Sequence, residues 1–526
     1  MDIKTIKTME EATSQRGFSY ARLAIAFLFI AGVYLWVTFT HGDVPNNTFL
    51  ILGAVFGAYM AMNIGANDVA NNVGPAVGSK ALTMFWAIVI AAVFEAAGAI
   101  IAGGEVVKTI KKGIIDPGMI DNPEIFIWAM AAALLSAALW LNLATSIGAP
   151  VSTTHSIVGG VMGAGIAAAG FAIVSWGTMG KIAASWVISP VLGGIIAASF
   201  LYFIKTKIVF KEDMVENAKK IVPLLVAIMA TAFGTYLMLK GVKKIVKVDF
   251  VTALAIGIAI GTMIFFVVKP MIAKAAAKIT KDRDGVNSLF TIPLIFAAAL
   301  LSFAHGANDV ANAIGPLAAI NAAITSGGIS GKVGIPLWVM LIGAIGIAVG
   351  LALYGPRLIK TVGSEITELD QMRAFSIAMA AAITVIIASQ LGLPVSSTHI
   401  AVGGVFGVGF LREYLDRGES KFIQTVRKKF KEDKAQLESM QKEFDKLDKK
   451  ESKSKKEYER IIELYKEIED KQELVKVEKK EFKSAKKIKY VKRDAVKKIV
   501  AAWIITVPAA ALLSAGVFFM IKGIMS

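Results

Sequence analysis

Long apolar stretches recur along the whole chain and leave little scope for a water-soluble fold. Most approach or exceed the roughly 20 residues that a helix needs to cross a bilayer. Hydrophobic residues make up 55% of the 526 positions. The stretches are continuous rather than alternating, so they predict helices and not a β-barrel. They lie at about 21–40, 49–66, 81–103, 126–147, 152–174, 181–204, 222–239, 250–269, 289–306, 334–355, 373–392, 395–411 and 497–521.

The predicted fold class is therefore an all-α polytopic membrane protein with about 12–13 apolar segments. The shorter segments are expected to be broken or re-entrant helices rather than full spans. The first stretch, "ARLAIAFLFIAGVYLWVTFT", is longer than the apolar part of a signal peptide and no cleavage site follows it, so we interpret it as a retained transmembrane helix.

One segment, 412–494, departs from this pattern because it holds 27 basic and 20 acidic residues. Its apolar residues keep helical spacing on both sides of "KKESKSKK" at 449–456. This pattern predicts a soluble, cytoplasmic helical hairpin with one narrow apolar seam. A regulatory or dimerising arm is one interpretation, and a solvated insertion without a role in transport is the favoured one.

The net charge of +17 does not indicate nucleic acid, because the lysines gather in loops and in this insert and no recognition motif accompanies them. The chain has no cysteine, which excludes disulfides, iron–sulfur clusters and cysteine-based zinc sites.

Three blocks of sequence occur twice in the same order. "GANDVANNVGP" at 65–75 returns as "GANDVANAIGP" at 306–316, and "PVSTTHSIVGG" at 150–160 returns as "PVSSTHIAVGG" at 394–404. "KIAASWVIS" at 181–189 returns as "KIVAAWIIT" at 498–506. The chain therefore contains two repeats of one structural unit.

The repeats begin at the second and ninth apolar segments, so seven crossings separate them and their orientations should be opposite. Such inverted-topology repeats are typical of secondary transporters. The loop 41–48 has no lysine or arginine, whereas 205–221 and 268–288 are rich in lysine. The positive-inside rule therefore predicts a cytoplasmic-membrane protein with its N-terminus and the 412–494 insert in the cytoplasm, although the lysines of 240–248 oppose this topology.

Asp68 and Asp309 lie inside apolar segments, where a carboxylate costs about 2.5–3.5 kcal/mol. Oxygen-bearing amides surround each, and nearby glycine and proline predict a local unwinding that frees backbone carbonyls. Oxygen ligands suit a hard cation, and we expect sodium. A structural amide network that joins the repeats is the alternative. The predicted sodium ligands are Asn67, Asp68, Asn308 and Asp309.

Each "PVS" block places small hydroxyls at the predicted start of a helix. Free N–H groups and the helix dipole favour an anion there, although the same residues also serve as ordinary N-caps. Because the pattern occurs in both repeats, we expect two helix starts that bind one tetrahedral oxyanion. The predicted phosphate ligands are Ser152, Thr153, Thr154, Ser396, Ser397 and Thr398.

Several other polar residues adjoin these motifs, and we expect them to serve in coupling or gating. The histidines could sense the protonation of phosphate or hydrogen-bond to a broken backbone. The buried acid Glu95 could relay protons, contact a cation or bond between helices. This group comprises Glu95, His155, His305, His399, Asn71 and Asn312.

The paired Gly-Ala-Asn-Asp-Val-Ala-Asn and Pro-Val-Ser-x-Thr-His blocks resemble those of the inorganic phosphate transporter (Pit) family, which includes sodium–phosphate symporters. The resemblance covers nearly the whole chain except 1–48 and 412–494. It implies phosphate as substrate, with sodium or proton coupling, or uptake of a metal–phosphate complex as in some bacterial members. The full Asn-Asp motif with a neighbouring Glu95 is more similar to the sodium-coupled members. The sequence departs from the family's animal members at 373–380, "RAFSIAMA", where repeat symmetry suggests a second buried glutamate.

The resulting prediction is a sodium-coupled symporter that imports inorganic phosphate across the bilayer by alternating access, without enzymatic activity or a bound cofactor. The alternative is a proton-coupled transporter of phosphate, metal-phosphate or another tetrahedral oxyanion such as sulfate. A cation channel and a membrane-anchored enzyme or interaction protein are weaker candidates. The sequence leaves a homo-oligomer open.

The predicted division has an extra helix in 1–48, the first repeat in 49–204 and two connecting helices in 205–288. The second repeat occupies 289–411 and ends with a last helix in 495–526, after the insert at 412–494.

Overall fold

The computed structural model describes residues 3–44, 47–147, 151–241, 248–326, 334–364, 369–419, 421–485 and 493–525. Regular structure in these residues is helical, and 11 helices are long and apolar enough to cross a membrane. This confirms the predicted fold class. The chain divides into two units, 1–408 with 493–526 and 409–492. The lysine-rich loop 240–248, which opposes the predicted topology, lies mostly outside the described residues.

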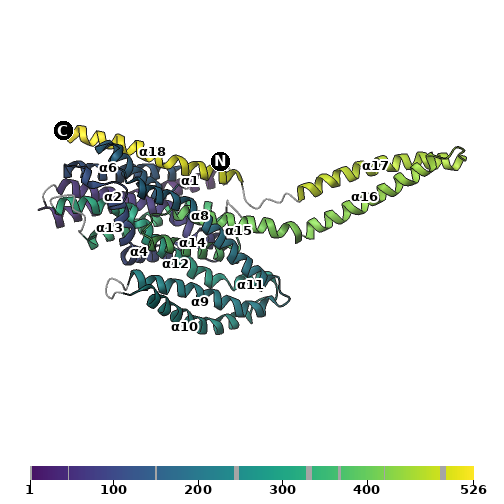
Figure 1. Cartoon of the computed structure of the whole chain (residues 1–526), viewed down its shortest axis with the longest axis horizontal. Helices are drawn as coiled ribbons and strands as arrows, with labels where there is room; N and C mark the ends of the chain where they lie inside the picture. Colours follow the sequence, from purple (N-terminus) through teal and green to yellow (C-terminus); the bar gives the residue numbers. More distant parts are fainter. Residues whose placement is uncertain are drawn as a thin grey trace. The chain divides into compact units, whose positions relative to one another are not determined.

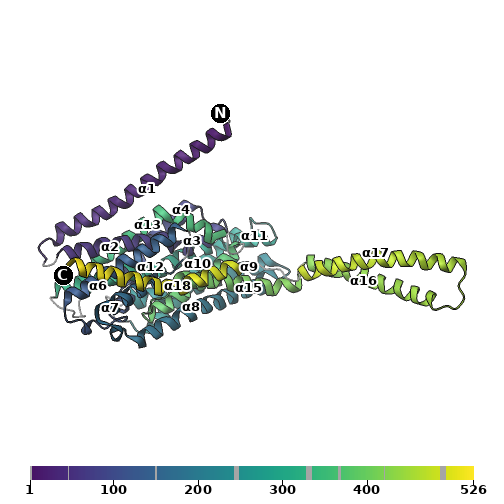
Figure 2. The same ribbon diagram turned by 90° about the horizontal axis from the view of Figure 1, so that it is seen from above.

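The first part of the larger unit contains the helices up to the end of the predicted first repeat. They are α1 (Ile3–His41), α2 (Asn47–Asn67), α3 (Val69–Gly78), α4 (Met84–Ala102), α5 (Gly104–Lys112), α6 (Pro123–Ser146), α7 (Thr153–Ala169) and α8 (Trp176–Ile204). Their boundaries follow local sequence, since Thr83 and Asn122 cap α4 and α6 with side-chain oxygens. Figure 2 shows α1 leaving the bundle obliquely toward the N-terminus.

The helices that follow are α9 (Met214–Lys240), α10 (Phe250–Ala276), α11 (Arg283–Ser288), α12 (Thr291–Thr325), α13 (Leu337–Ser364), α14 (Gln371–Gln390), α15 (Ser397–Glu419) and α18 (Arg493–Met525). α9 and α10 pack against each other as a pair at the side of the bundle (Figure 1). α7 has only 17 residues, and α7 and α15 both begin at the hydroxyl motifs. Both motifs therefore open helices, as the proline-hydroxyl pattern predicted.

Helices of the two predicted repeats pack against each other. α2 packs against α13, and α12 packs against α4. Glycines permit these crossings: a Cβ atom at Gly65 would collide with the backbone oxygen of Ile347, and one at Gly306 with that of Glu95. The two polar motifs are thus held at the centre of one buried core.

The second unit is a helical hairpin formed by α16 (Lys421–Asp448) and α17 (Lys455–Ala485). The most buried apolar residues of its seam are Leu437 and Leu464. At its tip, Ser454 and Glu457 cap α17 reciprocally. Hydrogen bonds from Lys450 and Ser454 lower the pKa of the Glu457 carboxyl group to about 2.

Candidate functional site

Both aspartates of the repeated motif are buried in the centre of the larger unit. Asp68 is 1% exposed and Asp309 is fully buried. Asp68 forms a one-residue interruption between α2 and α3, but Asp309 lies inside the continuous helix α12. The expected unwinding is therefore wrong for the second motif. Pro316 lies in α12 without breaking it, and its missing N–H leaves the carbonyl four residues earlier without that partner.

The hydroxyl motifs meet these aspartates across the core. Thr153 donates a hydrogen bond to Asp68 Oδ2 at 2.6 Å, and Ser397 donates to Asp309 Oδ2 at 2.9 Å. These residues occupy the same place in their repeats. Thr398 also donates to Asp68, at 3.0 Å, so α15 reaches across to the aspartate of the first repeat. The structure thus brings the predicted cation and phosphate ligands into one cluster.

The amide nitrogens of the motif's asparagines donate hydrogen bonds to hydroxyl groups. Asn71 donates to Thr398 at 2.9 Å, and Asn312 donates to Thr153 and Thr154 at 3.1 Å. Asn67 donates to Thr145 at 2.8 Å. In the other repeat, Asn308 donates to Ser389 at 3.0 Å.

The oxygen atoms of these amides are left without hydrogen-bond donors although they are buried. One oxygen of the Asp309 carboxylate is in the same condition. A buried acceptor without a partner lowers the stability of the folded protein by about 1–3 kcal/mol. A cluster of such oxygens therefore favours the binding of an electropositive ligand. The set comprises the Oδ1 atoms of Asn67, Asn71, Asn72, Asn308, Asp309 and Asn312.

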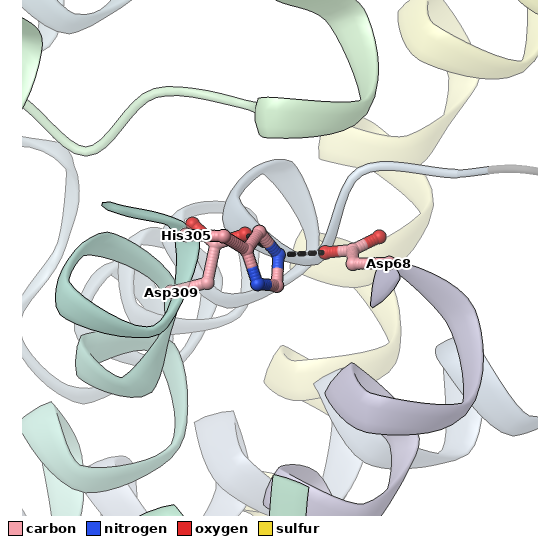
Figure 3. Close-up of side chains that lie close together, drawn as sticks. All are labelled: Asp68, His305 and Asp309. Atoms are coloured by element: carbon pink, nitrogen blue, oxygen red, sulfur yellow. Dashed lines mark ion pairs between the residues drawn. The ribbon is translucent and has the colours of Figure 1, made fainter. Parts of the chain in front are cut away.

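The charges of the cluster point the same way. His305 lies between the aspartates, 2.7 Å from Asp309 Oδ2 and 4.0 Å from Asp68 Oδ2 (Figure 3). Ligand atoms of these three side chains lie within 4.8 Å of one another, which is close enough to share one cation. The other ring nitrogen of His305, Nδ1, is 2.7 Å from the buried carboxylate of Glu95. In the described part of the chain, His305 alone forms ion pairs with these three carboxylates. Three acids thus share one base, and the donor set fits a hard cation.

The pair His305–Glu95 has no polar counterpart in the first repeat. Gly306 faces the backbone of Glu95, and the matching Gly65 faces the backbone of Ile347. His305 precedes Gly306, whereas Ile64 precedes Gly65. The counterpart of Glu95 is therefore Ile347 on α13, and the expectation of finding it at 373–380 is wrong. That expectation misaligned the repeats, because α4 and α13 align without a gap through identical residues such as Trp86 and Trp338 or Gly98 and Gly350, and this alignment places Ile347 opposite Glu95.

Two of the predicted phosphate ligands act as helix caps. The Ser152 hydroxyl accepts a hydrogen bond from the N–H of His155, and Ser396 accepts one from His399. Thr154 donates to the carbonyl of Val395, which joins the two hydroxyl motifs. The N-cap interpretation therefore describes what both serines do here, while Thr153, Ser397 and Thr398 contact the carboxylates.

The other two histidines of the motifs lie in an aromatic cluster. His155 is 3.8 Å from Trp186 and His399 is 3.6 Å from Trp503, measured between ring centroids, and the two imidazoles are 4.5 Å apart. His155 also approaches the backbone oxygen of Trp503 at 3.4 Å. Of the histidines in the motifs, only His305 contacts the carboxylates in the described residues.

Sequence analysis missed the two hydroxyls that receive the outer amides, Thr145 and Ser389. Each ends an apolar segment shortly before a "PVS" block, but a single hydroxyl in such a segment is too common to be a signal. It also missed Tyr236 on α9, which lies in the connecting region outside both repeats. Its hydroxyl is buried next to Ser389.

Comparison with known proteins identifies the family to which this cluster belongs. The model of the Phosphate transporter family matches residues 64–514, which include all the repeated motifs. The chain belongs to the phosphate transporter family. A Helicobacter pylori (strain J99) protein named "Putative phosphate permease" is 52% identical over 98% of both chains. A protein of the same description from Pyrococcus abyssi is 41% identical and covers 69% of this chain and 89% of its own.

A solved structure described as "The sodium-dependent phosphate transporter" has the same fold. It shares 32% sequence identity with this chain, with a TM-score of 0.73, and the match covers 90% of this chain and 99% of that one. These matches confirm the resemblance inferred from the paired motifs. This phosphate transporter family member is a membrane transporter with many spans.

Proposed function

We propose that this chain is a sodium-coupled symporter that imports inorganic phosphate by alternating access, with sodium at the Asp68–Asp309 cluster. The observation that carries this proposal is the set of buried amide and carboxylate oxygens without donors, beside three acids that share one histidine. The solved relative described as sodium-dependent supports the choice of ion. The contact between His305 and two of the acids keeps proton coupling as the alternative.

The hydrogen bonds of the cluster suggest how sodium and phosphate are coupled. Thr153, Ser397 and Thr398 use their hydroxyl protons on the carboxylates. A sodium ion on the carboxylate oxygens would take over this interaction and release the hydroxyls to donate to an oxyanion. Sodium should therefore raise the affinity for phosphate, and phosphate should raise the affinity for sodium by the same factor.

We expect phosphate uptake into proteoliposomes to require an inward sodium gradient. Radioactive phosphate uptake is measured with sodium, potassium and pH gradients imposed separately. Uptake that follows sodium and saturates with phosphate supports the symporter. Uptake that follows the proton gradient in the absence of sodium would instead establish the alternative. Sulfate, added in excess, tests whether the site accepts other tetrahedral oxyanions.

We also propose that the two repeats are inverted, with the N-terminus and the hairpin unit in the cytoplasm. Asn47 begins α2 and Ser288 ends α11, immediately before α12. Because the chain has no cysteine, Asn47→Cys and Ser288→Cys each provide one thiol. An impermeant maleimide applied to intact cells should label the first and not the second. Labelling of both from the same side would refute the inversion, and the cysteine-free parent is the control.

A further inference from the structure

Apolar cavities lie on both sides of the helix pair formed by α9 and α10. The first, of about 810 Å³, lies between this pair and α14. The second, of about 450 Å³, lies between the same pair and α12. None of the described residues that line either cavity is charged. Both cavities therefore favour hydrocarbon, and in a membrane the acyl chains of lipids supply it.

The first cavity is a long groove that is open to the side. Its lining runs from Leu224 to Leu239 along α9 and from Phe250 to Phe266 along α10. At 1.5 Å per residue, this stretch of α9 is about 22 Å long. One leaflet contributes roughly 15 Å to the hydrocarbon core of a bilayer. Ile258, midway along the α10 wall, is 52% exposed. The groove is thus long enough for an extended acyl chain and accessible to one.

Two polar groups at one end of this groove have no hydrogen-bond partner. Tyr236 is 1% exposed, and its hydroxyl lies next to Ser389 without a hydrogen bond. The Nε2 atom of Gln390 is also buried without a partner. By contrast, Thr235 and Thr262 of the same lining donate to backbone carbonyls of their own helices. Because a buried donor without an acceptor is unfavourable, Tyr236 and Gln390 favour a ligand that brings an acceptor oxygen.

The second cavity provides a comparison within the same molecule. It borders the same two helices, but none of its described lining residues has a buried polar atom without a partner. Ser288 lines it, and its hydroxyl donates to the carbonyl of Gly285 at 2.6 Å. Any hydrocarbon chain satisfies such a cavity. The first groove instead favours a molecule that carries a polar acceptor at one end of a long hydrocarbon chain.

The position and charge of the two donors narrow the class of this molecule. Tyr236 lies one turn before the end of α9, and Gln390 is the last residue of α14. Both donors therefore lie where membrane helices end, and the ester groups of phospholipids lie at that level of a bilayer. Since no described cationic side chain lines the groove, a neutral carbonyl fits the donors better than a phosphate or a carboxylate does.

We infer that the groove between α9, α10 and α14 binds one diacyl phospholipid, with an acyl chain along the groove and its ester carbonyl accepting hydrogen bonds from Tyr236 and Gln390. The site adjoins the central cluster, because Tyr236 lies next to Ser389, which accepts from Asn308 at 3.0 Å. The inference goes beyond the proposed function and does not depend on which ions or anions the cluster binds.

Native mass spectrometry of the purified full-length protein tests the site with two lipids. One is dioleoyl phosphatidylglycerol, and the other is its dialkyl ether analogue, which has the same headgroup and chain length but no carbonyl. The ester lipid should bind with about tenfold higher affinity, because the ether lipid leaves both donors without a carbonyl acceptor. Tyr236→Phe combined with Gln390→Leu should abolish this preference, since the variant lacks both donors.

Matched variants on one helix locate the lipid. Ala232 lines the first groove and Ala230 lines the second cavity, and both belong to α9. Ala232→Trp should abolish the preference for the ester lipid because the indole fills the groove, whereas Ala230→Trp should retain it. If Ala232→Trp fails to fold, Ile258→Trp fills the same groove from its exposed α10 wall.

Three results would overturn the inference. The first is equal affinity of the parent protein for the ester and ether lipids. The second is loss of the preference in Ala230→Trp but not in the variants that fill the first groove, which would place the lipid in the second cavity. The third is displacement of the phospholipid by an equal concentration of oleic acid, which would make a free fatty acid the occupant. Because binding is measured without transport, failure of phosphate uptake would leave the inference intact.

Discussion

Asp68→Asn and Asp309→Asn should each weaken sodium binding by at least an order of magnitude, or about 1.4 kcal/mol. The substitution keeps the shape of the side chain and most of its hydrogen-bonding capacity, but it removes the charge. A network that only joins the repeats should tolerate it well, whereas a sodium site should not. Phosphate affinity at a fixed sodium concentration should fall as well, because the coupling of the two ligands is reciprocal.

Two measurements test this expectation: the sodium dependence of phosphate uptake, and the rise in melting temperature that sodium produces in the purified protein. Asp121→Asn is the control, since Asp121 is an exposed acid in the loop before α6. Unchanged sodium dependence in both site variants would overturn the cation assignment. Loss in only one variant would show that the repeats have divided their roles.

The two variants should differ in how much sodium affinity they lose, because the two aspartates have different neighbours. Asp68 accepts hydrogen bonds from the hydroxyls of Thr153 and Thr398. Asp309 accepts one from Ser397 and lies 2.7 Å from His305. Since the imidazole compensates part of the charge of Asp309, we expect the larger loss of sodium affinity from Asp68→Asn.

The central cluster could be anticipated from sequence because acids and amides are expensive in apolar helices and these occur twice in the same order. Asp68, Asp309 and the hydroxyls of both "PVS" blocks therefore stood out individually. Their contacts could not be anticipated. Sequence symmetry predicts that the hydroxyls of each repeat donate hydrogen bonds to the aspartate of the same repeat. However, Thr398 of the second repeat donates to Asp68 of the first.

The parts that sequence analysis missed are those for which one residue carries no distinctive signal. Thr145 and Ser389 are ordinary hydroxyls at the ends of apolar segments, and Tyr236 lies in a connecting helix. The local unwinding expected at Gly306 did not occur, because that glycine serves a close helix crossing instead. Glycine and proline near a polar motif therefore indicate either a break or tight packing, and the sequence does not separate the two.

Removing Glu95 from its pair with His305 should cause a large loss of protein stability. Glu95 is fully buried and contacts His305 and Asn72, whose amide donates to it at 2.6 Å. Glu95→Ala would leave His305 and Asn72 without this partner in a buried site. Breaking a buried pair in this way costs about 3–5 kcal/mol, so we expect a marked loss of stability. Glu95→Gln keeps an acceptor oxygen and should cost less.

The chain itself provides the control for this prediction, because Ile64 and Ile347 occupy the equivalent positions in the first repeat. The double variant His305→Ile with Glu95→Ile replaces both partners by apolar groups. It should recover only part of the stability that Glu95→Ala loses, because the pair is removed as a whole but Asp309 loses its 2.7 Å contact with His305 and Asn72 loses its acceptor. Denaturant unfolding of the purified variants measures stability, and sodium-dependent phosphate uptake measures function. A stable double variant without uptake would assign His305 and Glu95 to the transport cycle, whereas full uptake would limit the pair to a structural role. Wild-type stability of Glu95→Ala would contradict the buried pair altogether.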